Sequence, residues 1–291
     1  MSSIDRLVPR LEQLLDRLDI LLPPAPSPLD WEQVIALRWR QRHGQGHLQA
    51  VPTPSGIDLA DLLGIDQQKS VVDLNTRQFI QELPANNVLL WGARGTGKSS
   101  LIKALLNTYK SMGLRLVQVD REGLIDLPDI VTTLRDRPER FIVWCDDLSF
   151  EAHEPGYKAL KTVLDGVGVG GNVLVYATSN RRHLLPEFHE DNRDTQWVGE
   201  EIHPGETVEE KISLSERFGL WLSFYPFSQE QYLAIVGHWL AHLGVEKGEA
   251  LTESLREAAL GWALAHGSRS GRSAWQFARD WVGRLGLDAF P

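Results

Sequence analysis

Cysteine is almost absent from this chain, and positive charge is not in excess. Of the 291 residues only Cys145 is a cysteine, which excludes an internal disulfide and with it the class of small disulfide-stabilised domains. Cys145 ends an apolar run directly before two aspartates, where we expect a reduced, buried side chain. The 30 Lys and Arg residues are outnumbered by 39 Asp and Glu residues, for a formal net charge of −9. This balance argues against a chain-wide nucleic-acid surface, because neutralising phosphates requires clustered cations.

Long hydrophobic runs are also missing. Charged residues such as Asp5, Arg6 and Arg10 interrupt the first twenty positions, which excludes a secretory leader. No later run approaches the roughly 18 apolar residues of a membrane-spanning helix. The histidines show neither H-E-x-x-H nor C-x-x-C spacing, so we expect no metal other than Mg²⁺. We therefore expect a cytoplasmic protein without a membrane partner.

What the chain does contain is a complete G-x-x-x-x-G-K-[ST] segment, which is typical of a phosphate-binding loop. It lies between an apolar run, 87–91, and a helical pattern that opens at Ser100. The residues of the segment are Gly92, Ala93, Arg94, Gly95, Thr96, Gly97, Lys98 and Ser99. In such loops the backbone N–H groups and the N-terminus of the following helix surround an anion.

The segment predicts specific roles for its last two residues. Lys98 is expected to reach the β- and γ-phosphates of a nucleotide, and the Ser99 hydroxyl to bind Mg²⁺. The alternative is a glycine-rich turn that merely opens an ordinary helix. A strand pattern before the segment and a helix pattern after it favour phosphate binding.

Short apolar runs alternate with helical patterns through the middle of the chain, which predicts βαβ units and a parallel sheet. The runs are Val88 to Trp91, Leu114 to Val119, Phe141 to Cys145, Val173 to Ala177 and Leu220 to Phe224. Helical patterns at 228–243, 249–266 and 270–285 follow, and amphipathic spacing at 4–21 and 31–42 predicts helices before the sheet. We expect an α/β fold of three α/β/α layers. The predicted domains are a helical N-terminal extension at 1–54, a nucleotide-binding domain at 55–225 and a helical lid at 226–291.

Carboxylates and an amide follow two of the expected strands. Asp146 and Asp147 come directly after the run 141–145, and Asn180 follows the run 173–177. Ligands of open α/β sheets bind at the carboxyl ends of the strands. Asp146 is therefore expected to hold Mg²⁺ and Asp147 to polarise an attacking water. The alternative is that the two aspartates cap the next helix.

The order of these elements resembles that of the AAA+ ATPases. The strings 172–187 and 214–224 are similar to a bacterial family of AAA+ proteins known only as a domain of unknown function, over roughly residues 55–285. The resemblance implies ATP as the nucleotide, with ADP as its product. It makes Asn180 a sensor of the γ-phosphate, and Arg217 an arginine finger that enters a neighbouring subunit's site.

The same resemblance implies two further parts of the site. Leu63, Gly64 and Ile65 would seat the adenine ring, and Arg269 or Arg272 would be a second sensor on the lid, with Arg269 favoured. Because these two arginines are three positions apart, we expect them to share one helix face. Each of the arginines could instead form a surface ion pair. If Arg217 acts on a neighbour, the protein forms nucleotide-linked homo-oligomers.

Two departures from the family pattern weaken some expectations. Asp147 stands where most AAA+ enzymes have glutamate, so hydrolysis is slow or assisted by Glu151, or the chain is an ATP-gated assembly module. The segment 120–128 lacks the pore-loop pattern of polypeptide-threading relatives, which disfavours unfolding by threading.

Three further segments leave partners open. The segment 38–43, with Arg38, Arg40 and Arg42 around Trp39, could contact nucleic acid, but a solvated helix face is favoured. The acidic stretch 187–210 is expected to face a partner or subunit. Asp120 to Gly123 matches a GTPase switch, yet no N-K-x-D guanine motif follows, so GTP is not favoured.

Overall fold

The computed structural model describes residues 28–42, 44–54, 56–150, 154–166, 171–181, 184, 196–198, 201–203, 214–245 and 252–288. The chain divides into two compact units, 1–34 and 35–291. In the first unit, the described residues form a turn in which the backbone N–H groups of Gln33 and Val34 donate to the Asp30 carbonyl. The second unit holds all the elements discussed below.

A seven-stranded, mostly parallel sheet forms the centre of the second unit, with strand order β2-β1-β4-β5-β6-β3-β9. Its strands are β1 (Ala36–Arg42), β2 (Gln45–Val51), β3 (Val88–Gly92), β4 (Leu114–Val119), β5 (Arg140–Cys145), β6 (Val173–Ser179) and β9 (Leu220–Phe224). Among the strand pairs of this sheet in the described ranges, only that of β1 with β2 is antiparallel. The five strands that the apolar runs predict are confirmed.

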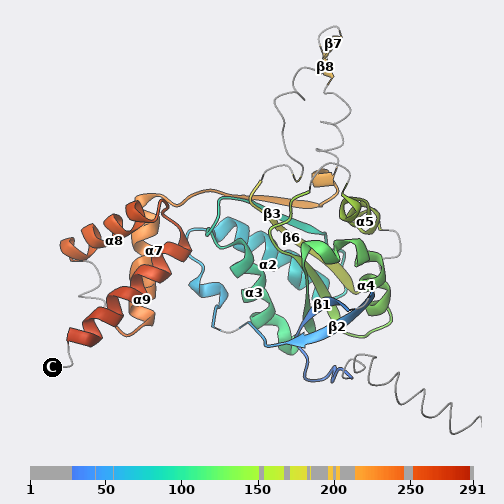
Figure 1. Ribbon diagram of the computed structural model, residues 1–291, viewed down its shortest axis with the longest axis horizontal. Helices are drawn as coiled ribbons and strands as arrows, with labels where there is room; N and C mark the ends of the chain where they lie inside the picture. Colours follow the sequence, from blue (N-terminus) through green and yellow to red (C-terminus); the bar gives the residue numbers. More distant parts are fainter. Residues whose placement is uncertain are drawn as a thin grey trace, which may run out of the picture. The chain divides into compact units, whose positions relative to one another are not determined.

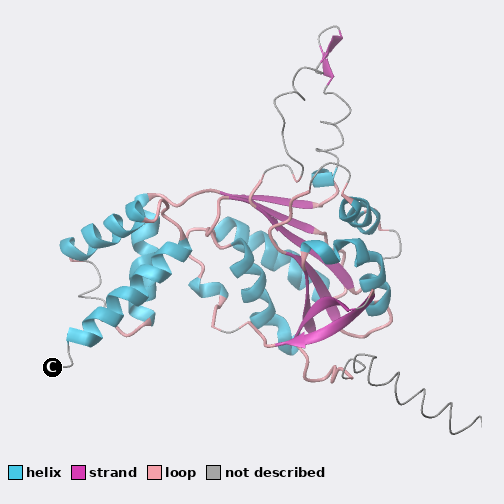
Figure 2. Ribbon diagram, viewed as in Figure 1, coloured by secondary structure: helices cyan, strands magenta, loops and turns pink. Residues whose placement is uncertain are grey.

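Helices cover both faces of this sheet, as Figures 1 and 2 show. On one face lie α2 (Asp66–Ile80) and α3 (Lys98–Tyr109), and on the other lie α4 (Leu127–Leu134) and α5 (Pro155–Leu164). Short 3₁₀ turns complete the layers at η1 (Leu59–Asp61), η2 (Lys110–Met112) and η3 (Arg121–Asp126). Strand β6 is buried along its whole length, as expected for a strand covered on both faces. The predicted three-layer α/β/α fold is confirmed.

The prediction of a helix at 31–42 is wrong, and so the predicted N-terminal extension is not helical in this part. Strands β1 and β2 form a hairpin with Arg42 opposite Gln45, and β1 joins the main sheet through β4. Gly44, in the connection, has a φ of +76°, as tight hairpin turns require. The Trp39 indole packs on Gly46, where an added Cβ would lie 1.9 Å from Cζ2, and its Nε1 donates to Asp126 at 2.7 Å.

Three helices follow the last strand and pack together, as predicted. They are α7 (Gln229–His242), α8 (Glu253–Ala265) and α9 (Gly271–Asp288). Ser228 caps α7, since its hydroxyl accepts from the Gln231 N–H while the Gln231 side chain accepts from the Ser228 N–H, a reciprocal capping box. The buried face of α7 carries Tyr232, Val236 and Leu240, which belong to the same hydrophobic core as the buried residues of α3.

Some predictions concern residues outside the described ranges. These include the helix at 4–21, Glu151, and most of the acidic stretch 187–210. Within that stretch, β7 (Gln196–Val198) pairs antiparallel with β8 (Glu201–His203). No helix in the described part of the chain is both long and apolar enough to cross a membrane.

Candidate nucleotide-binding site

The phosphate-binding loop is held against the neighbouring strand by its first glycine. Gly92 ends β3 with a φ of +128°, and a Cβ there would lie 2.0 Å from the Phe224 carbonyl oxygen. The Ala93 N–H donates to that same oxygen at 3.0 Å. At the other end of the loop, Gly97 precedes α3 in the left-handed conformation with a φ of +102°. Only glycine satisfies the contact at 92, so the loop can begin there and open into α3.

The Lys98 ammonium group lies folded into the loop. Its Nζ donates to the carbonyl oxygens of Gly92 at 2.8 Å and Ala93 at 2.7 Å, and to Asn180 Oδ1 at 3.3 Å. Burial lowers the pKa of Lys98 from its usual value, although the carboxylates of Asp147 and Asp146 act in the opposite direction. The structure therefore brings Lys98 and Asn180 together, as the sequence predicts.

The two aspartates after β5 lie at the carboxyl edge of the sheet, beside the loop. Asp146 Oδ1 accepts from the Ser99 hydroxyl at 2.7 Å and from the Thr178 hydroxyl at 2.6 Å. Thr178 Oγ1 also accepts from the Asp147 N–H at 2.9 Å. Thr178 thus connects β6 to both aspartates. Sequence reasoning missed it, although it stands two positions before Asn180.

Asp147 has an unusual backbone. Its φ is +52°, a left-handed conformation that is uncommon for residues other than glycine. Among those residues, Asp and Asn adopt it most readily. Its side chain accepts a hydrogen bond from Asn180 Nδ2. The Leu148 N–H then donates to the Thr178 carbonyl at 2.6 Å. The chain therefore turns sharply at Asp147, which disagrees with the alternative that the aspartates simply cap a helix.

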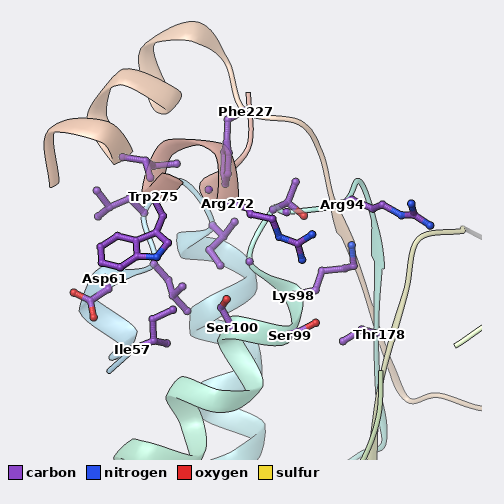
Figure 3. A pocket seen from close by; sticks show the side chains of 18 of the residues that line it. Ile57, Asp61, Arg94, Lys98, Ser99, Ser100, Thr178, Phe227, Arg272 and Trp275 are labelled. Atoms are coloured by element: carbon purple, nitrogen blue, oxygen red, sulfur yellow. The ribbon is translucent and has the colours of Figure 1, made fainter. Parts of the chain in front are cut away.

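A cavity of about 660 Å³ opens beside the loop and the aspartates, which is within the usual range for small-molecule sites. Its polar end holds the loop, with Lys98 and Ser99, and Figure 3 shows these side chains near Thr178. Leu63 and Ile65, which the family resemblance assigns to an adenine seat, line the cavity. Gly64 is not among the lining residues, but it has a φ of +75°, and a Cβ would lie 3.1 Å from the Phe227 ring.

The other wall of the cavity was not predicted. It comes from the predicted lid, 226–291, through Phe227, Ile235, Trp239, His242 and Trp275. These residues are far in sequence from the loop. Their helical spacing indicated a buried face but not what that face would cover.

The lid also contacts the loop directly. The Gly271 N–H, at the start of α9, donates to the Gly95 carbonyl at 2.8 Å. A Cβ on Gly95 would lie 2.8 Å from that of Ser270, so the loop and lid meet closely. A small residue at 95 is therefore required by this contact as well as by its φ of +73°.

The two lid arginines do not share a helix face, contrary to our expectation, because Arg269 precedes α9 and Arg272 lies in its first turn. Arg272 lines the cavity and Arg269 is not among the lining residues. Figure 3 shows the Arg272 side chain directed towards Lys98. The geometry therefore favours Arg272 over Arg269 as the lid residue of this site.

Arg217 lies outside the cavity of its own chain. Its Nε donates to Asp165 Oδ1 at 2.7 Å, and both side chains are partly exposed. Asp165 follows the last residue of α5. The structure thus separates Arg217 from the other predicted site residues.

The groups at the polar end fit a magnesium nucleotide. Ser99 and Asp146 offer hydroxyl and carboxylate oxygens, which are hard ligands suited to Mg²⁺. The backbone N–H groups of the loop and the N-terminus of α3 suit phosphates. Among the described residues there is no cluster of three or more His, Cys, Asp or Glu side chains able to hold a metal alone. Mg²⁺ does not require such a cluster, because it is commonly bound by one or two carboxylates together with the phosphates of a substrate.

Comparison with known proteins finds one family and one partial relative. A family model described as "Protein of unknown function (DUF815)" matches residues 32–285. The 26S proteasome regulatory subunit 4 homolog of Oryza sativa subsp. japonica is 29% identical over 153 residues, which cover 43% of this chain and 34% of that protein. The chain thus matches about a third of the length of this relative.

Solved structures of Thermotoga maritima RuvB have a similar fold. The RuvB Holliday junction branch migration motor superposes with a TM-score of 0.54 at 16% identity, over 80% of this chain and 67% of that one. A point mutant of the same RuvB gives a TM-score of 0.54 at 15% identity, over 81% of this chain and 68% of that one. This likeness, with the β9-β3-β6-β5-β4 order and the loop, confirms the predicted AAA+ fold. The chain belongs to the family described as "Protein of unknown function (DUF815)", and its fold is that of the AAA+ ATPases.

Proposed function

We propose that this protein binds Mg·ATP in the cavity and hydrolyses it. One observation carries the proposal: the phosphate-binding loop, the Ser99–Asp146 pair and the Asp147–Asn180 pair all meet at one end of a single cavity. A glycine-rich turn that merely opened a helix would not require these side chains to meet there. The rest of the cavity, lined by apolar side chains such as Leu63, Ile65 and Trp275, would take the base and the sugar.

Each residue of the site would have a separate role in the proposed hydrolysis. Lys98 would exchange its two backbone carbonyl partners for phosphate oxygens, and Ser99 with Asp146 would hold Mg²⁺. The metal would neutralise phosphate charge. Asp147 would accept a proton from the attacking water, and Asn180 would orient that water or the γ-phosphate. Thr178 holds both aspartates in place.

We infer that the site is completed by a second copy of the chain. Support comes from Arg217, which is absent from its own chain's cavity and partly exposed, as a residue acting on a neighbour must be. Such an arginine would stabilise charge on the transferring phosphoryl group. The protein would then form homo-oligomers whose assembly depends on nucleotide.

Phosphate release from Mg·ATP tests the proposed function. Lys98→Ala is expected to reduce release to the background, because it removes the cation that contacts the β- and γ-phosphates. Lys158→Ala, at an exposed lysine on α5, serves as the matched control and should match the wild type. Equal release by wild type and Lys98→Ala would end the assignment of ATPase activity.

A second function is favoured by the environment of Asp147. Its side chain is one methylene shorter than the glutamate of most AAA+ enzymes, and it is already bonded to Asn180. The chain could therefore be an ATP-gated assembly module with negligible turnover. This alternative predicts ATP-dependent oligomer size together with phosphate release no greater than that of Asp147→Asn.

The lid arginines provide a matched pair of variants. Arg272→Ala is expected to weaken ATP binding about tenfold or more, because a charge-assisted hydrogen bond contributes about 1.5–3 kcal/mol. Arg269→Ala, outside the cavity, should change the ATP dissociation constant by less than about twofold. Calorimetric titration with a slowly hydrolysed ATP analogue measures both. If Arg269→Ala lost more ATP affinity than Arg272→Ala, Arg269 would be the second sensor, as the family pattern favours.

A further inference from the structure

The lining of the cavity away from the loop is mostly apolar, and it includes the Asp61 carboxylate and the His242 imidazole. Figure 3 shows Asp61, Ile57 and Trp275 on the side of the cavity opposite Lys98, Ser99 and Thr178. All of these residues line the cavity. A flat apolar group bound there would meet the Trp275 indole, while its edge would meet the Asp61 carboxylate.

Asp61 is held in position by partners on two sides. Its Oδ1 lies 3.0 Å from His238 Nε2, on lid helix α7, and its Oδ2 accepts from the Asp58 N–H at 2.8 Å. The side chain is only 12% exposed. An ionised carboxylate has about four lone-pair directions and no donor. These two partners therefore leave it able to accept further hydrogen bonds from a ligand.

A largely buried carboxylate needs hydrogen-bond partners, and His238 and the Asp58 N–H supply two of them to Asp61. Its contact with His238 joins the segment before α2 to lid helix α7. Because the carboxylate can only accept, the ligand edge that fits it must donate. Of the purine edges, adenine offers its 6-amino group, whereas hypoxanthine offers a carbonyl oxygen at the same place.

We propose that Asp61 determines base specificity by accepting a hydrogen bond from the 6-amino group of adenine, with Trp275 as the stacking surface. This inference rests on the proposed function, since it places the base by taking the triphosphate to lie on the loop. In this proposal the Asp61 side chain recognises the edge of the base, while Leu63 and Ile65 contact its apolar face. It also couples base identity to the lid, because His238 holds the same carboxylate.

Wild-type protein and nucleotide analogues give the first test. Competition against a fluorescent ATP analogue measures dissociation constants for ATP, purine riboside triphosphate, ITP and GTP. ATP should bind about tenfold or more tightly than purine riboside triphosphate, which lacks the amino group. ITP should bind at least as weakly, since its oxygen faces a carboxylate. Equal binding of ATP and purine riboside triphosphate would overturn the proposal, as would tighter binding of GTP, whose edge donors lie elsewhere.

Variants separate the carboxylate from the stacking surface. In Asp61→Asn the amide can accept or donate, so the ratio between ITP and ATP should fall to within about threefold. Asp66→Asn, at an exposed aspartate in α2 outside the cavity, should keep the wild-type ratio. Trp275→Leu should weaken all four nucleotides alike. An unchanged ratio in folded Asp61→Asn, checked by circular dichroism, would contradict the role of Asp61.

The proposed function fails separately from this inference. If Lys98→Ala binds ATP as the wild type does, the loop is not the phosphate site and both proposals fail. If Lys98→Ala loses binding while wild type holds ATP and purine riboside triphosphate equally, only the role of Asp61 fails.

Discussion

Arg217→Ala is expected to lower the turnover of ATP about 10³- to 10⁵-fold while the dissociation constant of ATP stays near that of the wild type. An arginine that a neighbour inserts at the transferring phosphoryl group contributes a rate factor of about this size. Binding should survive because Arg217 does not line its own cavity. Steady-state phosphate release and a nucleotide titration measure the two quantities.

The folding of this variant should be nearly intact. The bond from Arg217 to Asp165 joins two partly exposed side chains, and such a pair is typically worth about 0–1 kcal/mol. Arg256→Ala removes another exposed arginine, 4.0 Å from Glu253 on α8, and should leave turnover unchanged. Wild-type turnover in Arg217→Ala would exclude the arginine finger.

Asp147→Asn is expected to lower turnover about 10²- to 10⁴-fold, the usual contribution of a general base, and to retain ATP. The substitution keeps the size of the side chain, and asparagine tolerates the left-handed backbone at this position. The variant should therefore fold normally and hold its nucleotide. Single-turnover hydrolysis with tightly bound ATP measures the chemical step directly.

Two comparisons make this prediction specific. Asp129→Asn, at an exposed aspartate in the first turn of α4, should hydrolyse ATP as the wild type does. Glu151→Gln tests the expected assistance by the neighbouring glutamate. Full turnover in Asp147→Asn together with loss in Glu151→Gln would transfer the role of base to Glu151.

The strands that carry the site could be predicted because burial on both faces demands continuous apolar runs. Val88 to Trp91 and Phe141 to Cys145 are such runs, and each is followed directly by residues of the site. The loop after β3 adds glycines whose backbone angles no other residue adopts easily, as Gly92 demonstrates. Local sequence therefore specifies both the sheet edge and the phosphate end of the cavity.

The edge hairpin could not be assigned by the same argument. Its arginines alternate with Leu37 and Trp39, but the segment is short and half exposed, so its period of 2 is easily mistaken for a helical period. The better signal is Gly44 between two seven-residue segments, 36–42 and 45–51, in which apolar and polar residues are mixed, and this fits a tight hairpin turn.

The apolar end of the cavity depends on contacts between distant segments. Asp61 and His238 are 177 positions apart, and neither lies in a motif. Trp239 on α7 and Trp275 on α9 have the spacing of ordinary core residues, and only the folded position of the lid brings both to the cavity. Arg272 is one of two candidates in the sequence, of which the family pattern favours Arg269, and the start of α9 separates them.

The central claim is that one ATP site is built from two copies of the chain, and mixing two inactive variants tests it most directly. Lys98→Ala keeps its Arg217, and Arg217→Ala keeps its loop, so a mixed oligomer contains sites with both groups intact. We predict that phosphate release from the 1:1 mixture rises well above that of either variant alone. A mixture that assembles, by light scattering, yet releases no more phosphate than its separate components would contradict the shared site.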